Sequence, residues 1–192
     1  MESPYQYVRE LPLREINEIQ QSLMEAYLEL SYTKSRKNIR VKELCKASYV
    51  ARSTFYVYYD SMEELLEHIE NNIIYRLLKL NDALAYEERT ISSMAFYGET
   101  LAYLNTHKRW FYSFLVQEPN QSFIKKWKDA IKQHLWERVR HKGLSGQQNE
   151  ALILEMVAAE AIAGYTFWLA HPYETNEADI KQLLIYTLGM LE

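Results

Sequence analysis

Apolar residues recur every three or four positions along most of this 192-residue chain. That spacing is the period of an α-helix with one buried face. The first run starts at Ile16 and passes through Ile19, Leu23 and Tyr27 to Leu30. We therefore predict an amphipathic helix here, followed by a polar and basic connection.

Two shorter apolar patterns follow, and a long one comes after them. The short patterns consist of Val41, Leu44 and Cys45, then of Val50, Phe55, Tyr58 and Tyr59. Next, Ser61 can accept the backbone amide of Glu64 while the Glu64 carboxylate reaches back, which is a capping box. It predicts the start of a long helix over residues 61–80, whose buried face comprises Leu65, Ile69, Ile73 and Leu77.

The second half of the chain is rich in aromatic residues and keeps the helical period. We predict helices over residues 122–141, 151–170 and 176–191, with a loop at residues 143–146. The apolar side chains of residues 151–170 lie almost all round the helix, which predicts that it is buried. Pro172 ends it, because proline disfavours helix at the preceding residue, and Asn176 can cap the last helix.

The composition supports an all-α fold in a reducing compartment. Five Gly and four Pro are too few for a turn-rich all-β protein. The single cysteine, Cys45, cannot form an internal disulfide, and we expect a buried inert thiol there, with a redox sensor as the alternative. The first ten residues lack a signal-peptide core, and Glu155 and Glu160 interrupt the most apolar stretch. We expect a cytoplasmic protein without a membrane span.

The formal net charge of −4 hides two unlike regions. Residues 32–56 hold seven basic residues and one acid, a local charge of +6 that leaves −10 on the rest. A basic region on an acidic chain is an electrostatic footprint for nucleic acid, and a solvated charged face is the alternative. The pattern beneath it favours nucleic acid, because two short helices joined by a brief turn form a helix-turn-helix.

The residues of these helices also resemble a known family. Residues 39–46 read Ile-Arg-Val-Lys-Glu-Leu-Cys-Lys, and the run Thr-Phe-Tyr-Val-Tyr-Tyr at residues 54–59 precedes the capped Glu-Glu-Leu-Leu helix. Over about residues 16–77 this sequence resembles the DNA-binding domain of TetR-family bacterial transcriptional regulators. The resemblance implies a helix-turn-helix domain at residues 1–60, then a helical ligand-binding and dimerisation domain at residues 61–192, with the helix at 61–80 connecting them.

The resemblance implies a DNA-binding role for eight residues. They are Lys37, Arg40, Lys42, Arg52, Ser53, Thr54, Tyr56 and Tyr58. The three that open the recognition helix would face bases, and the basic residues before them would hold phosphates. The hydroxyls of Tyr56 and Tyr58 would reach phosphates or the groove edge, with plain packing as the alternative, while Phe55 and Leu44 would be core.

Three positions depart from the family's pattern. Tyr49 stands where the turn usually has glycine, and a positive φ is costly for tyrosine. Ala51 replaces the serine that usually caps the recognition helix, which loses about 1 kcal/mol. Met62 replaces a lysine that contacts phosphate. Each departure weakens the expected DNA binding, for which Lys34, Arg36 and Lys37 would partly compensate.

The C-terminal domain of this family usually binds a small molecule, whose binding changes the spacing of two recognition helices. Such a pocket is concave and mostly apolar, with a few polar groups. The candidate lining residues are Tyr97, Tyr103, His107, Trp110, Phe114, Trp127 and Phe167, with ordinary core packing as the alternative.

The last two predicted helices offer more apolar surface than one small domain can cover. We therefore predict a twofold dimer through a four-helix bundle, as the resemblance also implies. The candidate dimerisation residues are Ala159, Ala163, Phe167, Leu184 and Leu188.

The favoured function is a ligand-responsive repressor that a small molecule releases from its double-stranded DNA operator. The alternative is a family relative that has lost operator binding and regulates through a protein partner. No enzyme is expected, because the chain has no phosphate-binding loop, nucleophile elbow or catalytic triad. No cofactor or metal site is expected either, since the five histidines lie far apart without an i, i+4 pair.

Overall fold

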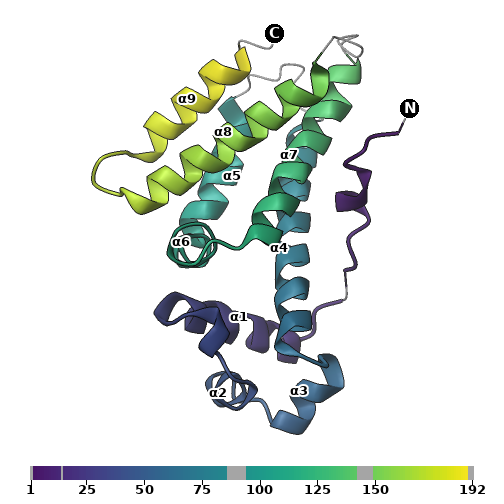
Figure 1. Ribbon diagram of the computed structural model, residues 1–192, viewed down its shortest axis with the longest axis vertical. Helices are drawn as coiled ribbons and strands as arrows, with labels where there is room; N and C mark the ends of the chain where they lie inside the picture. The colour runs from purple at the N-terminus through teal and green to yellow at the C-terminus, as the bar shows by residue number, and fades with distance from the viewer. Residues whose placement is uncertain (1, 14, 86–93, 142–148, 190–192) are drawn as a thin grey trace.

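The computed structural model describes residues 2–13, 15–85, 94–141 and 149–189, and every regular element in these ranges is helical (Figure 1). The all-α prediction is therefore confirmed. The α-helices are α1 (Glu18–Thr33), α2 (Val41–Ala47), α3 (Arg52–Tyr58), α4 (Met62–Ala85), α5 (Met94–Thr106), α6 (Lys108–Tyr112), α7 (Gln121–His141), α8 (Glu150–Ala170) and α9 (Glu177–Gly189). Short elements between them are the 3₁₀ turns η1 (Gln6–Arg9) and η2 (Arg36–Asn38) and the π-helical segment η3 (Ser113–Gln117).

Helices α1, α2 and α3 gather at one end of the molecule, at the bottom of Figure 1. Asn17 caps α1 in a reciprocal capping box with Gln20. Leu23 and Tyr27 are buried on the inner face of α1 as predicted, but Ile19 is exposed, because the buried face begins at Gln20. The periodicity thus predicted the helix, and tertiary packing decided which face turned inward.

The helix α4 begins at the predicted cap and joins the two parts of the molecule (Figure 1). The Ser61 hydroxyl oxygen accepts the amide of Glu64 at 3.1 Å. The Glu64 carboxylate accepts the amide of Asp60, one residue before the predicted one, at 2.6 Å. The predicted inner positions are all buried, namely Leu65, Ile69, Ile73 and Leu77. One continuous helix therefore connects the end of the molecule that holds α1, α2 and α3 to the rest.

The helix α8 packs against α7 and α9 but is not buried all round, contrary to the prediction. Leu152, Met156 and Phe167 are 57%, 62% and 46% exposed. Within the described residues, α8 is the one helix long and apolar enough to cross a membrane by length and composition. A core helix of a soluble protein meets the same criteria, and Glu155 of α8 forms an ion pair with Lys132 of α7 at 2.8 Å. Its place is therefore within a helical bundle, with one apolar face left open.

The predicted boundaries of the last helices are confirmed where the structure describes them. Helix α8 ends at Ala170, before Pro172. The side-chain oxygen of Asn176 accepts the amides of Ala178 and Asp179 at 2.8 and 3.1 Å, which caps α9. The predicted loop at residues 143–146 and the end of the chain after residue 189 lie outside the described residues.

The N-terminal segment lies beside α4 and α7, far from the helix-turn-helix (Figure 1). Tyr7 donates a hydrogen bond to Asp129 at 2.5 Å. Arg9 forms ion pairs with Asp82 at 3.0 Å and Glu137 at 2.5 Å. The predicted first domain, residues 1–60, therefore includes a segment that packs on the second part of the molecule.

Candidate functional site

Helix α3, the predicted recognition helix, is anchored by one face and open on the other. Phe55 is fully buried, as predicted, and Tyr59 is 1% exposed. The Tyr59 hydroxyl shares a 2.7 Å hydrogen bond with the Nδ1 atom of His68, which ties the end of α3 to α4. Arg52 and Ser53 in the first turn are exposed. Because Phe55 packs inward, Arg52 and Ser53 face the solvent. Contacts to DNA bases would require this orientation.

Arg52 is paired with Tyr56 one turn later. The Arg52 Nη2 atom donates to the Tyr56 hydroxyl at 3.3 Å, and the guanidinium carbon lies 5.6 Å from the ring centroid. Both side chains are exposed. This i, i+4 contact presents a cation and a hydroxyl together on the exposed side of α3.

The other predicted DNA contacts divide into exposed and half-buried side chains. Lys37, Arg40 and Lys42 are exposed, and Arg40 is the residue that precedes α2. Thr54 and Tyr58 are half-buried, and Tyr58 packs against the hydrophobic core. The observed contact therefore supports the packing alternative for Tyr58. The side chains of Lys37, Arg40 and Lys42 are open to solvent.

Two of the three basic residues expected to compensate for the missing phosphate contact are engaged within the protein. Lys34 forms an ion pair with Glu43, the single acid of that region. Arg36 donates to the backbone oxygen of Ser113 at 3.1 Å. These internal contacts compete with the phosphate contacts that Lys34 and Arg36 were expected to make. The third candidate, Lys37, is exposed.

Arg36 joins the helix-turn-helix domain to the π-helical segment η3. Its guanidinium carbon lies 5.2 Å from the Phe114 ring centroid, and its backbone amide donates to the Glu118 carboxylate at 2.8 Å. Burial raises the pKa of Glu118, but the Arg36 amide and charge outweigh it and hold that pKa below its usual value. The Ser113 hydroxyl donates to the Ser31 backbone oxygen at 2.9 Å. Sequence reasoning missed this role because Arg36 looks like any member of a basic run.

The turn between α2 and α3 has the strain that Tyr49 predicts. Tyr49 adopts a φ of 57°, and its side chain is 97% exposed. Ala51 precedes α3 without a side-chain capping hydrogen bond, as expected. Burial raises the pKa of the nearby Cys45 thiol, which favours the inert-thiol interpretation.

Three of the predicted effector-binding residues form an aromatic cluster where α5 meets α6. His107 stacks on Trp110 with 4.0 Å between ring centroids, and Tyr103 approaches His107 edge-on at 4.7 Å. All three are half-buried. Burial, with a smaller effect of the Arg76 charge, lowers the pKa of His107, so that its ring is mainly neutral at pH 7.

The remaining predicted effector residues lie elsewhere. Trp127 is buried and stacks on Tyr165 at 5.3 Å, and buried Phe114 contacts Phe123 edge-on at 5.2 Å. These contacts support the core-packing alternative. Phe167 lies on the open face of α8, where it is 46% exposed. The Tyr97 side chain lies outside the described residues.

A surface groove of about 610 Å³ adjoins this region, where α6 and the end of α8 meet α1. Arg109 borders it, lying 4.4 Å from the Tyr32 ring centroid and pairing with Glu29 at 2.7 Å. The groove is lined by Tyr32, Lys108, Arg109, Tyr112, Leu169, Ala170, His171, Pro172, Tyr173 and Glu174. Its residues come from α1, α6, the end of α8 and the connection after α8, which are far apart in the chain, so no sequence motif indicated it.

An exposed apolar face runs along α8. It consists of Leu152, Met156, Ala159, Ala163 and Phe167. Three of these residues were predicted for dimerisation. The first two were missed, because a helix that is apolar all round gives no sequence signal for its outward face.

Helix α9 also exposes apolar side chains, but they differ from those predicted. Leu183 and Tyr186 are 60% and 66% exposed. Leu184 is 5% exposed and packs inward, so its predicted place on a dimer face is wrong for this protomer. The Leu188 side chain lies outside the described residues.

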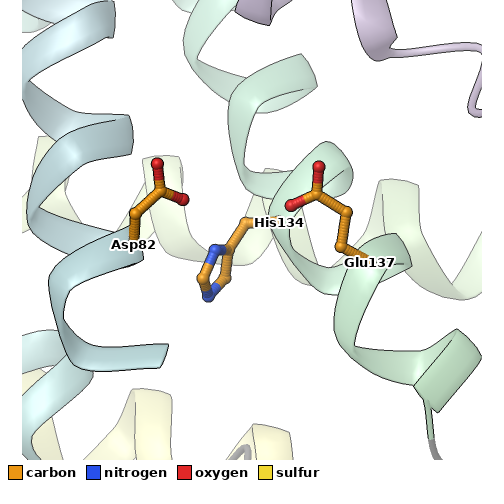
Figure 2. A group of neighbouring side chains, drawn as sticks. All are labelled: Asp82, His134 and Glu137. Atoms are coloured by element: carbon orange, nitrogen blue, oxygen red, sulfur yellow. The ribbon is translucent and has the colours of Figure 1, made fainter. Parts of the chain in front are cut away.

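A polar cluster lies between α4 and α7 (Figure 2). Asp82 comes from α4, and His134 and Glu137 come from α7; one ligand atom of each lies within 4.8 Å of the others. Arg9 pairs with both carboxylates. The sequence predicts no metal site because its histidines are far apart, but the fold supplies carboxylates to His134 from two helices.

Comparison with known proteins identifies the fold. No model of a protein family matches the chain, and no curated protein matches its sequence. The fatty acid degradation regulator FadR from Bacillus halodurans has a TM-score of 0.76 at 14% identity, covering 93% of this chain and 99% of that one. A protein described as a TetR-family transcriptional regulator from Syntrophomonas wolfei has a TM-score of 0.76 at 12% identity, covering 91% and 94%. FadR from Bacillus subtilis, solved with stearoyl-CoA, has a TM-score of 0.72 at 13% identity, covering 88% and 96%.

These likenesses extend over nearly the whole length of both chains. The chain therefore has the fold of TetR-family transcriptional regulators, as the sequence resemblance predicts. At such identities the likeness establishes the fold alone, and the function has to be argued from the chain's own residues.

Proposed function

We propose that the chain is a transcriptional repressor that binds a double-stranded DNA operator as a homodimer and leaves it when a small molecule binds the C-terminal domain. The observation that carries the proposal is the exposed set of Arg52, Ser53 and Tyr56 on α3, beside Arg40 and Lys42. Exposed basic residues on α3 and around α2, on a chain of net charge −4, are suited to an anionic polymer. The proposal places the protein in the cytoplasm and assigns it no enzymatic activity.

The dimer in this proposal forms through the open faces of α8 and α9. Twofold symmetry would pair each face with itself, so that Met156 and Phe167 lose their exposure to water. Small side chains at Ala159 and Ala163 would let the helices approach closely. The same symmetry would place two recognition helices against successive major grooves.

The ligand in this proposal binds near Tyr103, His107 and Trp110, where aromatic surface and one neutral imidazole meet. Stearoyl-CoA is the first probe, because FadR from Bacillus subtilis, which has a similar fold, was solved in complex with it. Addition of the probe should reduce operator affinity. Replacement of Trp110 by Ala should reduce this response while operator binding without the probe persists.

The test of DNA binding is a fluorescence-anisotropy titration of labelled fragments from the chain's own upstream region at several salt concentrations. Arg52→Ala should weaken binding roughly ten- to hundredfold, the cost of a lost base contact. Lys42→Ala should reduce the salt dependence by about one phosphate contact. The matched control is Lys79→Ala, an exposed cation on α4 away from this face. Unchanged binding in both interface variants would refute the assigned surface.

A second candidate is a co-regulator that acts through a protein partner without an operator. The strained turn at Tyr49 and the missing cap at Ala51 favour it, because both reduce the stability of the helix-turn-helix. This candidate predicts no measurable affinity for any genomic fragment, together with a stoichiometric partner protein that co-purifies.

A further inference from the structure

The cluster of Asp82, His134 and Glu137 has the composition of a metal site (Figure 2). We propose that these three side chains bind a divalent first-row transition metal ion, and that the ion competes with Arg9 for the two carboxylates. The proposal stands apart from operator binding, since it concerns residues at the other end of α4.

The three side chains supply one imidazole nitrogen and two carboxylates from facing helices. His134 and Glu137 are three residues apart on α7, which places them on one face, and Asp82 approaches from α4. Zinc-ligand distances are about 2.0–2.2 Å, so two atoms bound to one ion lie at most roughly 4.4 Å apart. The donor atoms lie within 4.8 Å of one another, so a small rotation of the side chains would bring them within reach of one ion.

The ligand chemistry selects the class of ion. Imidazole suits zinc, iron, nickel and copper, and carboxylates accept all of these. Magnesium and calcium prefer more oxygen ligands and keep water or carbonyl groups around them. His134 is 2% exposed, so its nitrogen donor is shielded from water. This position favours an ion that binds imidazole.

A buried amide orients one of the carboxylates. The Gln133 side-chain nitrogen donates to the Glu137 Oε1 atom at 2.6 Å, and Gln133 is 0% exposed. The same nitrogen donates to the Gln6 side-chain oxygen at 3.0 Å. Such outer hydrogen bonds hold metal ligands in place and contribute to affinity.

Arg9 engages the same oxygens that an ion would use. Its Nε and Nη2 atoms contact the two oxygens of Glu137 at 2.8 and 2.5 Å. Its Nη1 and Nη2 atoms contact the two oxygens of Asp82 at 3.1 and 3.0 Å. A metal ion would have to displace the guanidinium, so each cation lowers the apparent affinity of the other. Metal binding would therefore loosen η1 from α4 and α7.

The test is isothermal titration calorimetry of the full chain with zinc chloride, with magnesium chloride as the comparison ion. Zinc should bind once per chain, and magnesium should give no binding heat. Asp82→Asn and Glu137→Gln should each weaken zinc binding at least tenfold, while Arg9→Ala should strengthen it about tenfold. The matched control is Glu155→Gln, a carboxylate paired with lysines elsewhere, which should leave zinc affinity unchanged.

Three results would overturn the proposal. These are no zinc binding by either the wild type or Arg9→Ala, zinc binding that survives both carboxylate substitutions, or an Arg9→Ala affinity that does not rise. Melting curves by circular dichroism establish that each variant is folded before titration. As a second measurement, zinc should speed trypsin cleavage after Arg9 several-fold in the wild type and leave the Asp82→Asn rate unchanged; an unchanged wild-type rate with zinc bound would refute the competition.

Discussion

The Arg36 Nη1 atom lies 3.1 Å from the backbone oxygen of Ser113, and this hydrogen bond links the helix-turn-helix domain to the segment after α6. Ser113 is the first residue of the π-helical segment, and the Arg36 Nη2 atom also donates to the backbone oxygen of Glu118, which follows the segment. Carbonyl groups at the C-terminal end of a helix attract a cation. Arg36, a side chain of the basic region itself, therefore helps to hold the α1–α3 end of the molecule against the rest of the chain.

We expect Arg36→Ala to lower the free energy of unfolding by about 2 kcal/mol, because it removes charge-assisted hydrogen bonds at a partly buried boundary. Lys37→Ala is the matched control, since it removes an exposed neighbouring cation and should change stability by less than about 0.5 kcal/mol. Urea denaturation followed by circular dichroism measures both. Equal losses in the two variants would contradict the linking role of Arg36.

Tyr49→Gly should raise the free energy of unfolding by about 1 kcal/mol. The φ of 57° is costly for tyrosine and is free of strain for glycine, and a side chain that is 97% exposed loses little packing. Ala47→Gly, near the end of α2, should instead destabilise by up to about 1 kcal/mol. Thermal and urea melts of the two variants test this contrast. A loss of stability in Tyr49→Gly would contradict the prediction.

Lys126→Met should destabilise the protein by about 3–5 kcal/mol, because it leaves the Glu70 carboxylate buried without its cation. The pair is 2.9 Å apart, with side chains 14% and 4% exposed. Lys125→Met is the neighbouring control: its ion pair with Asp129 has a lysine that is 70% exposed, and its loss should cost about 0–1 kcal/mol. Restored stability in Lys126→Met combined with Glu70→Gln would show that the unpaired charge is the cause.

Stability should fall in acid as Asp129 becomes protonated. Burial raises the pKa of Asp129, but hydrogen bonds from Lys132, Tyr7 and Lys125 outweigh it and hold that pKa below its usual value. A carboxyl group of this kind stabilises the fold above its unfolded pKa of about 3.9, and the contribution is lost as pH falls through the folded pKa.

Asp129→Asn should therefore be less stable than the wild type at pH 7 and lose less additional stability below about pH 4. Urea melts between pH 7 and pH 2 give both quantities. Glu67→Gln removes an exposed carboxylate outside this network and should leave the stability at pH 7 unchanged. Parallel acid limbs in the wild type and Asp129→Asn would contradict the assignment.

Met156→Asp should convert the proposed dimer to a monomer, because it places a charge in the centre of the open face of α8. Sedimentation velocity at micromolar concentration measures the change. Tyr49→Asp, which replaces an aromatic side chain that is 97% exposed between α2 and α3, is the control and should stay dimeric. A wild type that sediments as a monomer would defeat the dimer itself.

Much of the fold follows from local sequence signals. Helical periodicity, the caps at Ser61 and Asn176 and the stop before Pro172 depend on residues a few positions apart, so they can be read along the chain. The strain at Tyr49 was indicated by the family resemblance, because the family usually has glycine at this turn. The resemblance to TetR-family regulators rests on the same short segment and agrees with the observed fold.

The sequence by itself thus determined that the chain is helical, where most helices begin and end, and that one basic region precedes an aromatic second part. Only the tertiary structure decided that Arg36 joins two parts of the molecule, that Leu184 turns inward and Met156 outward, and that Asp82 meets His134. The physical reason is that burial and ion pairing depend on which helix faces come together. Those contacts form between residues far apart in the chain, where no local period records them.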